Sequence, residues 1–393
     1  MVIVNKRMKK ILKTIYRRLK NIERTYEYYE IKKLLAKENF SAVRNEKPDT
    51  IKNIVFIIPG MVAHAGGHTS ILRLGSKLCD YGYNISYVSY GSQSISEMKK
   101  SASLNLEDYK GFFYDSSYIK KISGDVIVAT NWRSVYIAKK IPGYKIYFIQ
   151  DYEPYFYSLG DYYFLAKYTY DMGFHMISLG SWNKSVIEKN SYYNNRKIDV
   201  IDFPYEKTEY KNGKRDFSLY KEKKEIKIAV YIKDEEKRLP YMSQFLLSNL
   251  AEEFKKNGKK LHVLYFGLDP LFKVHYGKNI GKLSKKQLNQ LYQNVDFGMV
   301  ASMTNISLIP YEMIAAGLPI IEFIEGSFSA FFPENSAILT NFNASTLYRR
   351  LSDAMINWQQ LRDSQINAIK YIQQYSWDKT VKQFADILEN IRQ

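Results

Sequence analysis

The chain has 393 residues, of which 46% are hydrophobic, 15% aromatic and 25% charged. This composition excludes a disordered chain and a fibrous repeat, and the length suffices for two domains with separate cores. Lys and Arg outnumber Asp and Glu by 58 to 40, so the formal charge is +18 and we expect an anionic partner.

A single cysteine, Cys79, excludes an internal disulfide and a multi-cysteine metal site, which fits a reducing compartment such as the cytosol. The longest apolar run, residues 54–63, is interrupted by Pro59 and Gly60 and is shorter than the roughly 20 residues that a membrane-spanning helix needs. The basic N-terminus lacks the apolar core and cleavage site of a secretory signal, so we expect it to stay on the protein.

Residues 1–49 are predicted to form a basic helical extension. Residues 1–24 contain one acid, Glu23, and nine cations, which gives +8: Lys6, Arg7, Lys9, Lys10, Lys13, Arg17, Arg18, Lys20 and Arg24. Apolar residues recur at helical spacing and would form one stripe: Met8, Ile11, Leu12, Ile15, Leu19 and Ile22. Such an amphipathic helix suits an anionic membrane surface. Docking of the stripe on the protein itself is a second interpretation. Nucleic-acid binding is disfavoured because no recognition motif accompanies the charge.

From residue 50 onward, short apolar runs alternate with helical patterns, which is the spacing of parallel sheets. One series of strands is expected at residues 53–58, 84–90, 125–130, 145–150 and 175–180, and a second at 226–232, 261–267, 296–300 and 319–323. A charged stretch, residues 206–225, is interpreted as a linker. The predicted fold is therefore α/β, with doubly wound Rossmann-like domains at residues 50–210 and 211–374 and a closing helix at 375–393. Ligands of such sheets bind at the carboxyl ends of the strands, so two facing edges predict a cleft.

A glycine-containing turn, residues 59–69, follows the first predicted strand. Gly66 and Gly67 would let backbone approach a ligand, and the N–H groups that open the next helix can receive a phosphate or a sugar hydroxyl. A purely structural turn is nearly as well supported. His68 beside the glycines is a candidate for proton transfer or, more simply, a local hydrogen-bonding residue.

Two cations, Lys233 and Arg238, follow the first strand of the second series. At the carboxyl end of that strand they could grip a diphosphate without a metal ion. Their acidic neighbours, residues 234–236, support the alternative of a solvated charged turn.

A polar turn at residues 304–307 leads into a helix with Glu312 near its start. Pro310 sits where a missing N–H costs little, and the surroundings of the helix are apolar. A carboxylate in this position could hold sugar hydroxyls in the cleft.

The segment FIQDYEP, residues 148–154, ends an apolar strand with Asp151 and Glu153. This spacing imitates the metal-binding Asp-x-Asp of single-domain glycosyltransferases. A metal site, an edge that contacts an acceptor, and simple turn capping remain open for it. Asn131 in TNWRS, also at a strand end, is comparably ambiguous.

Taken together, these segments resemble GT-B glycosyltransferases of the large retaining family 4, over about residues 50–393. In that family the N-terminal domain receives the acceptor and the C-terminal domain holds a nucleotide sugar. Gly66 and Gly67 match its Gly-Gly turn, Lys233 and Arg238 match the basic pair on the donor diphosphate, and Glu312 matches the second Glu of a Glu-x7-Glu element.

The resemblance also implies a donor side built from further residues. GKLS, residues 281–284, matches the segment whose backbone contacts the base, which assigns Leu283 to the donor. Thr304, Asn305, Ile306 and Ser307 precede Glu312 in the same element, and YSWDKT, residues 375–380, resembles the entry to the crossing helix. Two departures are notable. Thr304 stands where the family usually has Glu, and Lys233 stands where Arg is commoner, which replaces a bidentate fork by a point charge.

More narrowly, residues 58–73, 149–174 and 180–182 resemble rhamnosyltransferases that build bacterial S-layer glycans and related surface polysaccharides. The implied donor is dTDP-β-L-rhamnose, used with retention and without a metal cofactor. The implied acceptor is a lipid-linked or membrane-associated glycan, met on the inner face of the plasma membrane, with His68, Asn131, Asp151 and Glu153 on the acceptor side. Two alternatives are a catalytically silent glycan-binding or scaffold protein of the same fold, and the same fold with a UDP-hexose donor.

The resemblance implies a mechanism in which Lys233, Arg238 and backbone N–H groups meet the charge that grows on the departing nucleoside diphosphate. The sequence-based expectation is that Lys233→Ala or Arg238→Ala weakens donor binding and leaves the fold intact.

Overall fold

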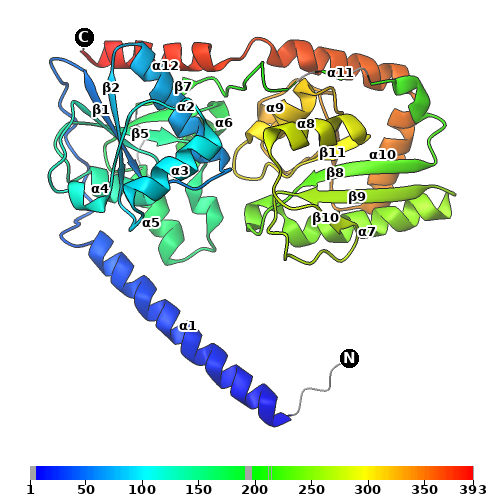
Figure 1. Cartoon of the computed structure of the whole chain (residues 1–393), viewed down its shortest axis with the longest axis horizontal. Helices are drawn as coiled ribbons and strands as arrows, with labels where there is room; N and C mark the ends of the chain where they lie inside the picture. Colours follow the sequence, from blue (N-terminus) through cyan, green and yellow to red (C-terminus); the bar gives the residue numbers. More distant parts are fainter. Residues whose placement is uncertain (1–5, 191–196, 211, 214, 393) are drawn as a thin grey trace.

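The structure is a computed structural model that describes residues 6–190, 197–210, 212–213 and 215–392, with the side chains of residues 6–10 left out. Two α/β units lie side by side, each built on a parallel sheet flanked by helices (Figure 1). The predicted fold class is confirmed. The domain limits at residues 50, 211 and 375 stay predictions, whereas the strands of the two sheets fall within Asn53–Ile201 and Glu225–Thr340.

The first sheet has seven strands in the order β3-β2-β1-β4-β5-β6-β7, and every neighbouring pair is parallel. The strands are β1 (Asn53–Ile58), β2 (Asn84–Ser89), β3 (Phe112–Tyr114), β4 (Val126–Ala129), β5 (Tyr144–Ile149), β6 (His175–Leu179) and β7 (Ile198–Ile201). The Ile, Val, Tyr and Phe side chains of the inner strands are buried on both faces, as expected for a parallel sheet covered by helices, whereas Phe112 of β3 and Val200 of β7 at the two edges are exposed. The strand order reverses between β1 and β4, which places a crevice at the carboxyl end of β1.

Helices cover both faces of this sheet. They are α2 (Gly66–Asp80), α3 (Ile95–Asn105), α4 (Trp132–Ala138), α5 (Asp161–Thr169) and α6 (Ser181–Asn190), with short 3₁₀ turns η1 (Ser116–Tyr118) and η2 (Glu153–Phe156). Ile71 and Leu74 of α2 pack in one apolar cluster, and Trp132 and Val135 of α4 pack in another. The sheet therefore separates two cores.

The second sheet has six strands in the order β10-β9-β8-β11-β12-β13. They are β8 (Glu225–Tyr231), β9 (Lys260–Phe266), β10 (Lys278–Asn279), β11 (Phe297–Met299), β12 (Ile320–Phe323) and β13 (Ile338–Thr340). The flanking helices are α7 (Pro240–Lys256), α8 (Lys285–Asn294), α9 (Leu308–Ala315) and α10 (Ala344–Ile356), with 3₁₀ turns η4 (Glu236–Arg238) and η5 (Phe328–Ala330). The order reverses between β8 and β11, so the crevice lies at the carboxyl end of β8.

The charged stretch that was predicted as a linker does connect the two sheets, but it is anchored. Its 3₁₀ turn η3 (Phe217–Tyr220) buries two aromatic rings, and Arg215 donates hydrogen bonds to the carbonyls of Gly317 (2.9 Å) and Tyr292 (2.6 Å). Aromatic residues within this charged stretch therefore anchor it to the second unit. The low average hydrophobicity of the stretch does not reveal this anchoring.

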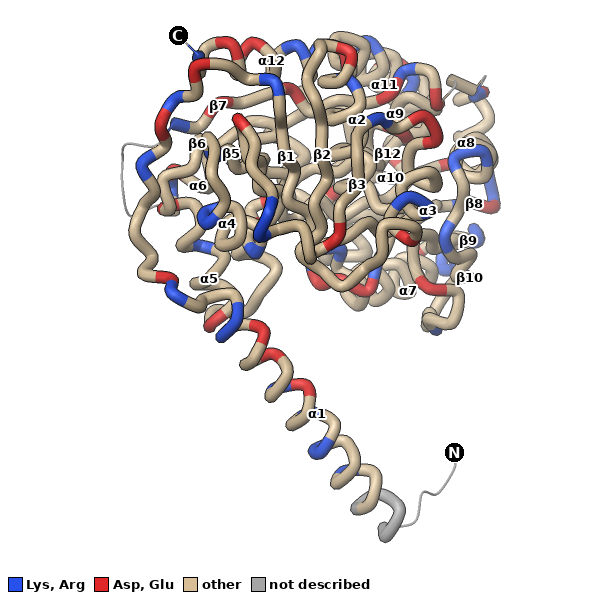
Figure 2. Tube along the Cα trace, turned by 60° about the vertical axis from the view of Figure 1, so that its left-hand side comes forward, with Lys and Arg blue, Asp and Glu red and all other residues tan. Residues whose placement is uncertain are grey.

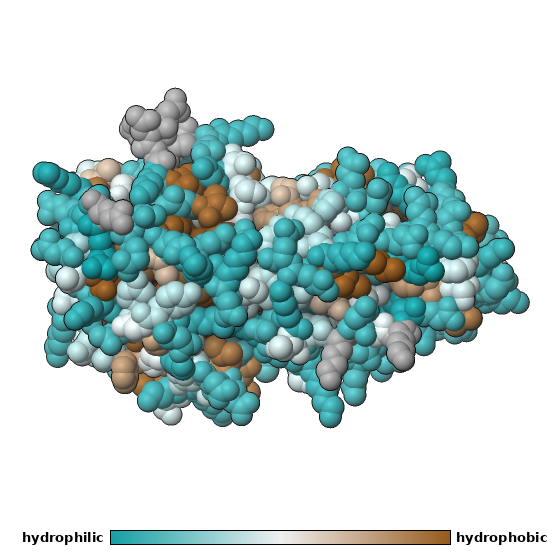
Figure 3. Space-filling model, turned by 90° about the horizontal axis from the view of Figure 1, so that it is seen from above, coloured by the Kyte–Doolittle hydropathy of each residue, from teal (hydrophilic) through white to brown (hydrophobic). Residues whose placement is uncertain are grey.

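The last helices return the chain to the first unit. Helix α11 (Trp358–Ile372) covers the second sheet, and α12 (Trp377–Arg392) packs on α2 and β7 of the first. Trp377 is buried and Lys77 of α2 pairs with Asp378 at 2.5 Å. Seen from the side of α11 and α12, the surface is mostly hydrophilic with small scattered apolar patches (Figure 3). Residues 377–392 thus form the predicted closing helix, and residue 393 lies outside the described residues.

Helix α1 (Lys6–Leu34) projects away from the two units (Figures 1 and 2). Its C-terminal end contacts the body, through Ile31 and Leu34 beside α4. The predicted stripe from Ile11 to Ile22 is exposed, with Ile22 at 67%, so in the described residues it does not dock on the protein itself. Residues 1–5 and the side chains of Met8, Lys6, Arg7, Lys9 and Lys10 lie outside the description. The described helices include none that is long and apolar enough to cross a membrane.

Candidate functional site

A cleft of about 670 Å³ lies between the two units, at the carboxyl ends of both sheets. The start of α2, the loop after β8, the segment before α8 and the start of α9 line it. Five of the predicted donor-side residues are in its wall: Gly66, Lys233, Leu283, Ser307 and Glu312. Residues that are up to 246 positions apart in the sequence therefore meet where the two strand orders predict a ligand.

The start of α2 opens into the cleft. Ala65 precedes the helix and has no polar side chain that could cap it, so the first N–H groups remain available to an anion. A Cβ on Gly67 would come within 3.4 Å of Gln150 Oε1, whereas a Cβ on Gly66 would meet nothing within 4 Å among the described atoms. The glycine pair thus leaves the helix start bare on the cleft side.

Lys233 reaches the cleft from the loop after β8. Its ammonium lies 3.7 Å from Glu235 and its side chain is 31% exposed. His68 lies near enough to feel this charge: burial, chiefly, and then Lys233 lower the pKa of His68. The Val62 N–H donates to His68 Nδ1 at 2.7 Å, which places the proton of the neutral ring on Nε2. Lys233 and the start of α2 therefore face the same space from opposite units.

Arg238, the second predicted cation, lies behind the cleft wall. It is 7% exposed, donates from Nη1 to the Ala301 carbonyl at 2.7 Å, and stacks its guanidinium 5.6 Å from the ring centre of Tyr231. In the part of the chain that the structure describes, it is not among the cleft-lining residues. The predicted pair is thus divided into a cleft cation and a buried one, and the expectation that Arg238→Ala leaves the fold intact does not fit this burial.

Glu322, which the sequence analysis did not single out, lies near Arg238 in the middle of β12. It is fully buried and accepts a 2.7 Å hydrogen bond from Ser302 Oγ. Burial raises the pKa of Glu322 to about 8, against the hydrogen bond from Ser302 and the charge of Arg238, which lower it. A Glu inside the apolar run PIIEF was a signal that could have identified this buried carboxyl group.

Glu312 lies in the first turns of α9 and in the cleft wall, as predicted. Burial raises the pKa of Glu312 to about 7, although the Tyr210 hydroxyl donates a hydrogen bond to it. Among the described residues, Oε2 of Glu312 has no hydrogen-bond partner. The pKa of the Glu312 carboxyl group is therefore close to neutral pH, and its unpartnered Oε2 could accept a hydrogen bond from a ligand hydroxyl.

Three further charged residues join the two units at the cleft, and the sequence analysis did not single them out. Glu209 accepts from Arg73 of α2 and from Lys285 of α8, and Arg73 lies 3.6 Å from Glu206. Arg73, Glu209 and Lys285 all line the cleft. Arg73 is the last residue of segment 58–73, which the sequence analysis compares with rhamnosyltransferases. The spacing of residues in that segment does not show that Arg73 faces the second unit.

The residues before Ser307 contact the first unit instead of the cleft. Thr304 is buried and its hydroxyl donates to Asp151 Oδ1 at 2.7 Å. Asn305 donates from Nδ2 to the Gln150 carbonyl at 2.6 Å, and Ile306 is buried in the core that spans both units. Within the described ranges none of these three lines the cleft.

The predicted acceptor-side residues have separate partners. Asn131 caps α4 by accepting from Ser134 N–H at 2.9 Å, which is the capping interpretation. Glu153 is buried and accepts at 2.5 Å from both the Tyr147 hydroxyl and the Trp132 N–H, while burial raises the pKa of Glu153 to about 8. Asp151 turns to the second unit. Among the residues described, no group of three or more His, Cys, Asp or Glu side chains is placed to hold a metal ion.

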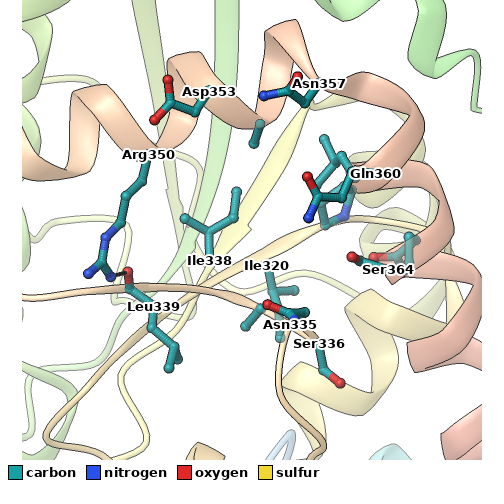
Figure 4. Close-up of a pocket in the computed structure, with 15 residues that line it drawn as sticks. Ile320, Asn335, Ser336, Ile338, Leu339, Arg350, Asp353, Asn357, Gln360 and Ser364 are labelled. Carbon is teal, nitrogen blue, oxygen red and sulfur yellow. Dashed lines mark hydrogen bonds between the residues drawn. The ribbon is translucent and has the colours of Figure 1, made fainter.

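A second hollow of about 280 Å³ lies at the other end of the second sheet (Figure 4). Arg350 and Asp353 of α10 and Gln360 of α11 surround it, and Arg350 donates to the Leu339 carbonyl at the edge strand β13. It is far from the residues that the two strand orders bring together.

Comparison with known proteins identifies the fold. HepE from Anabaena, solved with UDP-glucose, superposes with a TM-score of 0.66 at 12% identity, covering 86% of this chain and 99% of that one. TarM gives 0.69 at 10% identity (86% and 99%), and WaaG, involved in lipopolysaccharide biosynthesis, gives 0.59 at 13% (85% and 99%). The chain has the GT-B fold of these glycosyltransferases.

Sequence comparison gives a more distant relative. The O-antigen biosynthesis protein RfbC of Myxococcus xanthus is 24% identical over 290 residues, which are 65% of this chain and 20% of RfbC. The chain therefore spans about a fifth of the length of this relative. No family model matches the chain.

Proposed function

We propose that the protein is a glycosyltransferase that moves a sugar from a nucleotide donor to a glycan acceptor during assembly of a surface polysaccharide. The observation that carries this proposal is the position of Lys233 opposite the uncapped start of α2, because this pair of positive features suits a diphosphate. The biosynthetic role named for RfbC and the ligand of HepE support the same reaction class.

In the proposed reaction the bond between the anomeric carbon and the donor phosphate breaks, and an acceptor hydroxyl forms the new bond to that carbon. The hydroxyl approaches on the face from which the phosphate departs and its proton passes to that phosphate. No protein nucleophile is therefore needed, and the sugar keeps its anomeric configuration. Lys233 and the α2 N–H groups stabilise the charge that grows on the diphosphate. Glu312 and the backbone around Leu283 orient the nucleoside.

For the donor we propose dTDP-β-L-rhamnose, on the resemblance of residues 58–73 and 149–174 to rhamnosyltransferases, with UDP-hexoses as the alternative. Incubation of the purified protein with dTDP-rhamnose, UDP-glucose and UDP-galactose, each with a lipid-linked acceptor extract, should give labelled product with dTDP-rhamnose. Thermal unfolding with each donor provides a second measurement, and we expect a raised midpoint with dTDP-rhamnose. Transfer from a UDP-hexose instead would refute the rhamnosyl assignment.

A second candidate is a glycan-binding scaffold without activity. The observation that favours it is Thr304, which stands where the resembled family usually has Glu and whose hydroxyl donates a hydrogen bond to Asp151. Absence of both transfer and thermal protection with every donor would favour the scaffold over the enzyme.

Helix α1 is proposed to hold the protein at the inner face of the plasma membrane, beside a lipid-linked acceptor. Its exposed apolar residues share the helix with basic residues in its N-terminal half, and Figure 2 shows this half far from the body. Each Lys or Arg near an anionic bilayer contributes about 1 kcal/mol.

Deletion of residues 1–24 is therefore expected to abolish sedimentation with vesicles of anionic phospholipid and to leave transfer to a soluble acceptor unchanged. As a control, the full chain should bind far less to neutral phosphatidylcholine vesicles. Persistent binding of the truncated protein to anionic vesicles would contradict the anchor.

A further inference from the structure

Asp151 receives contacts from two separate loops of the opposite unit. From the loop between β11 and α9, the Thr304 hydroxyl donates to Oδ1 at 2.7 Å. From the loop between β8 and α7, the Lys237 ammonium lies 3.4 Å from Oδ2. One carboxylate at the end of β5 is thus shared by two segments that are 67 residues apart.

Each contact is supported by a neighbouring one. Lys237 also lies 4.1 Å from the ring centre of Phe156, and its side chain is 16% exposed, so it is held on the first unit. Asn305, next to Thr304, donates to the Gln150 carbonyl at 2.6 Å and the Leu179 carbonyl at 3.2 Å. The interaction is therefore buried more deeply than a surface ion pair, which contributes little by itself.

The two loops that meet at Asp151 lead to three of the cleft residues of the second unit. Lys233 is in the loop of Lys237, and Ser307 and Glu312 follow Thr304 directly. Arg238, in the first of these loops, donates a hydrogen bond to the Ala301 carbonyl just after β11. Ser302, in the second loop, donates to Glu322 of β12, so both loops are also fixed to the second unit. Movement of either loop away from Asp151 would displace the cleft residues that it carries.

We propose that Asp151 is a positioning residue that aligns the two donor-side loops across the gap between the units. This inference rests on the proposed transferase function. It assigns Asp151 to the donor geometry instead of to a metal ion or to the acceptor. It also accounts for Thr304, because a Glu in that position would place a second carboxylate against Asp151.

The kinetic test separates donor from acceptor. We expect Asp151→Ala to raise the KM for the nucleotide sugar about tenfold, with the acceptor KM unchanged, because a loss of about 1.4 kcal/mol corresponds to one decade. Thr304→Val should reproduce part of this change and Thr304→Ser should restore it. In the Asp151→Ala background, Thr304→Val should add nothing further.

Two more variants test the contacts of Asp151 with Thr304 and with Lys237 separately. Asp151→Asn keeps an oxygen that can accept from Thr304 but removes the charge facing Lys237. Lys237→Met keeps an unbranched side chain but removes the ammonium that faces Asp151 and Phe156. The two should give similar, intermediate changes in donor KM. Asp161→Ala, an exposed carboxylate at the start of α5, is the matched control and should behave as wild type.

A spectroscopic measurement does not depend on activity. Spin labels on Lys120→Cys and Lys256→Cys, one exposed site in each unit, in a Cys79→Ser background, report the distance between the units. Asp151→Ala should give a broader distribution with longer distances than wild type. Unchanged distances together with an unchanged donor KM would overturn the positioning role, as would a change confined to the acceptor KM. If the wild type transfers no sugar, the proposed function fails while the distance distributions still test the interaction at Asp151.

Discussion

Lys233→Ala is expected to lower kcat/KM for the nucleotide sugar about 100-fold and to leave the free energy of unfolding within about 0.5 kcal/mol of wild type. Lys233 is 31% exposed in the cleft wall and its nearest charged partner, Glu235, is 3.7 Å away, so little folding energy depends on it. A hydrogen bond to a charged group contributes about 1.5–3 kcal/mol, and stabilisation of a growing charge in a closed cleft adds to this. Steady-state kinetics and urea unfolding of the same preparation provide both measurements.

Two control variants sharpen this prediction. Lys233→Arg should retain most of the activity, because it restores the charge and supplies a bidentate guanidinium fork. Lys255→Ala, at an exposed position late in α7, removes a cation of the same unit outside the cleft and should leave kcat/KM unchanged. An equal loss in Lys255→Ala would mean that overall charge, and not a diphosphate site, governs donor use.

The fold was largely predictable because its main signals are local. The long strands β1, β5, β8 and β9 are predominantly apolar, and their predicted ends differ from the observed ones by a residue or so. Ser284 and Gln287, three residues apart, form a capping box at the start of α8, a pattern that the sequence also carries. Such patterns depend on neighbours along the chain, so sequence suffices to identify them.

The short strands β3, β7, β10 and β13 were not predicted. They have two to four residues each, and each lies at or near the edge of its sheet. Segments of this length have no periodicity to read, because pairing with an adjacent strand, and not their own composition, makes them extended. These strands can therefore be identified only once the neighbouring strand of the sheet is known.

The sequence could predict which segments meet at the site, but not which side chains contact one another there. Lys233 and Glu312 line one cleft, at the carboxyl ends of the parallel strands where ligands of such sheets bind, and their roles there stay predictions. The contact of Asp151 with Thr304 spans 153 positions, and no local pattern connects them. The burial of Arg238 depends on Leu239, whose backbone is left-handed (φ 47°) and turns the chain into α7 just after a highly charged run. In sequence that run has the composition of an exposed turn.

Arg238→Met is expected to destabilise the fold by about 3 kcal/mol at pH 8, in contrast to Lys233→Ala. The substitution keeps an unbranched apolar side chain but removes the guanidinium, and with it the hydrogen bond to the Ala301 carbonyl, the contact with the Tyr231 ring and the positive charge near Glu322. A buried carboxylate that loses its cation keeps the full penalty of desolvation. Urea unfolding, with the slope checked for constancy, measures the change.

The loss should also depend on pH. The pKa of Glu322 is about 8 in the folded protein and 4.5 when exposed, so between these values the folded state holds a proton that the unfolded chain releases. Folding stability from this group therefore falls as pH rises through that window and levels off above pH 8. Without Arg238 the pKa of Glu322 rises further, so the decline should continue above pH 8 in Arg238→Met. The difference between variant and wild type should be larger at pH 9 than at pH 6.

Glu322→Gln removes the titrating group and separates the two contributions of Arg238. In that background Arg238→Met should cost the same at pH 6 and pH 9, because what remains is the hydrogen bond to Ala301 and the packing on Tyr231. A pH-dependent loss that persists without Glu322 would contradict the pairing of these two buried groups. A stable Arg238→Met protein with weakened donor binding would instead return Arg238 to the diphosphate, as the sequence alone suggests.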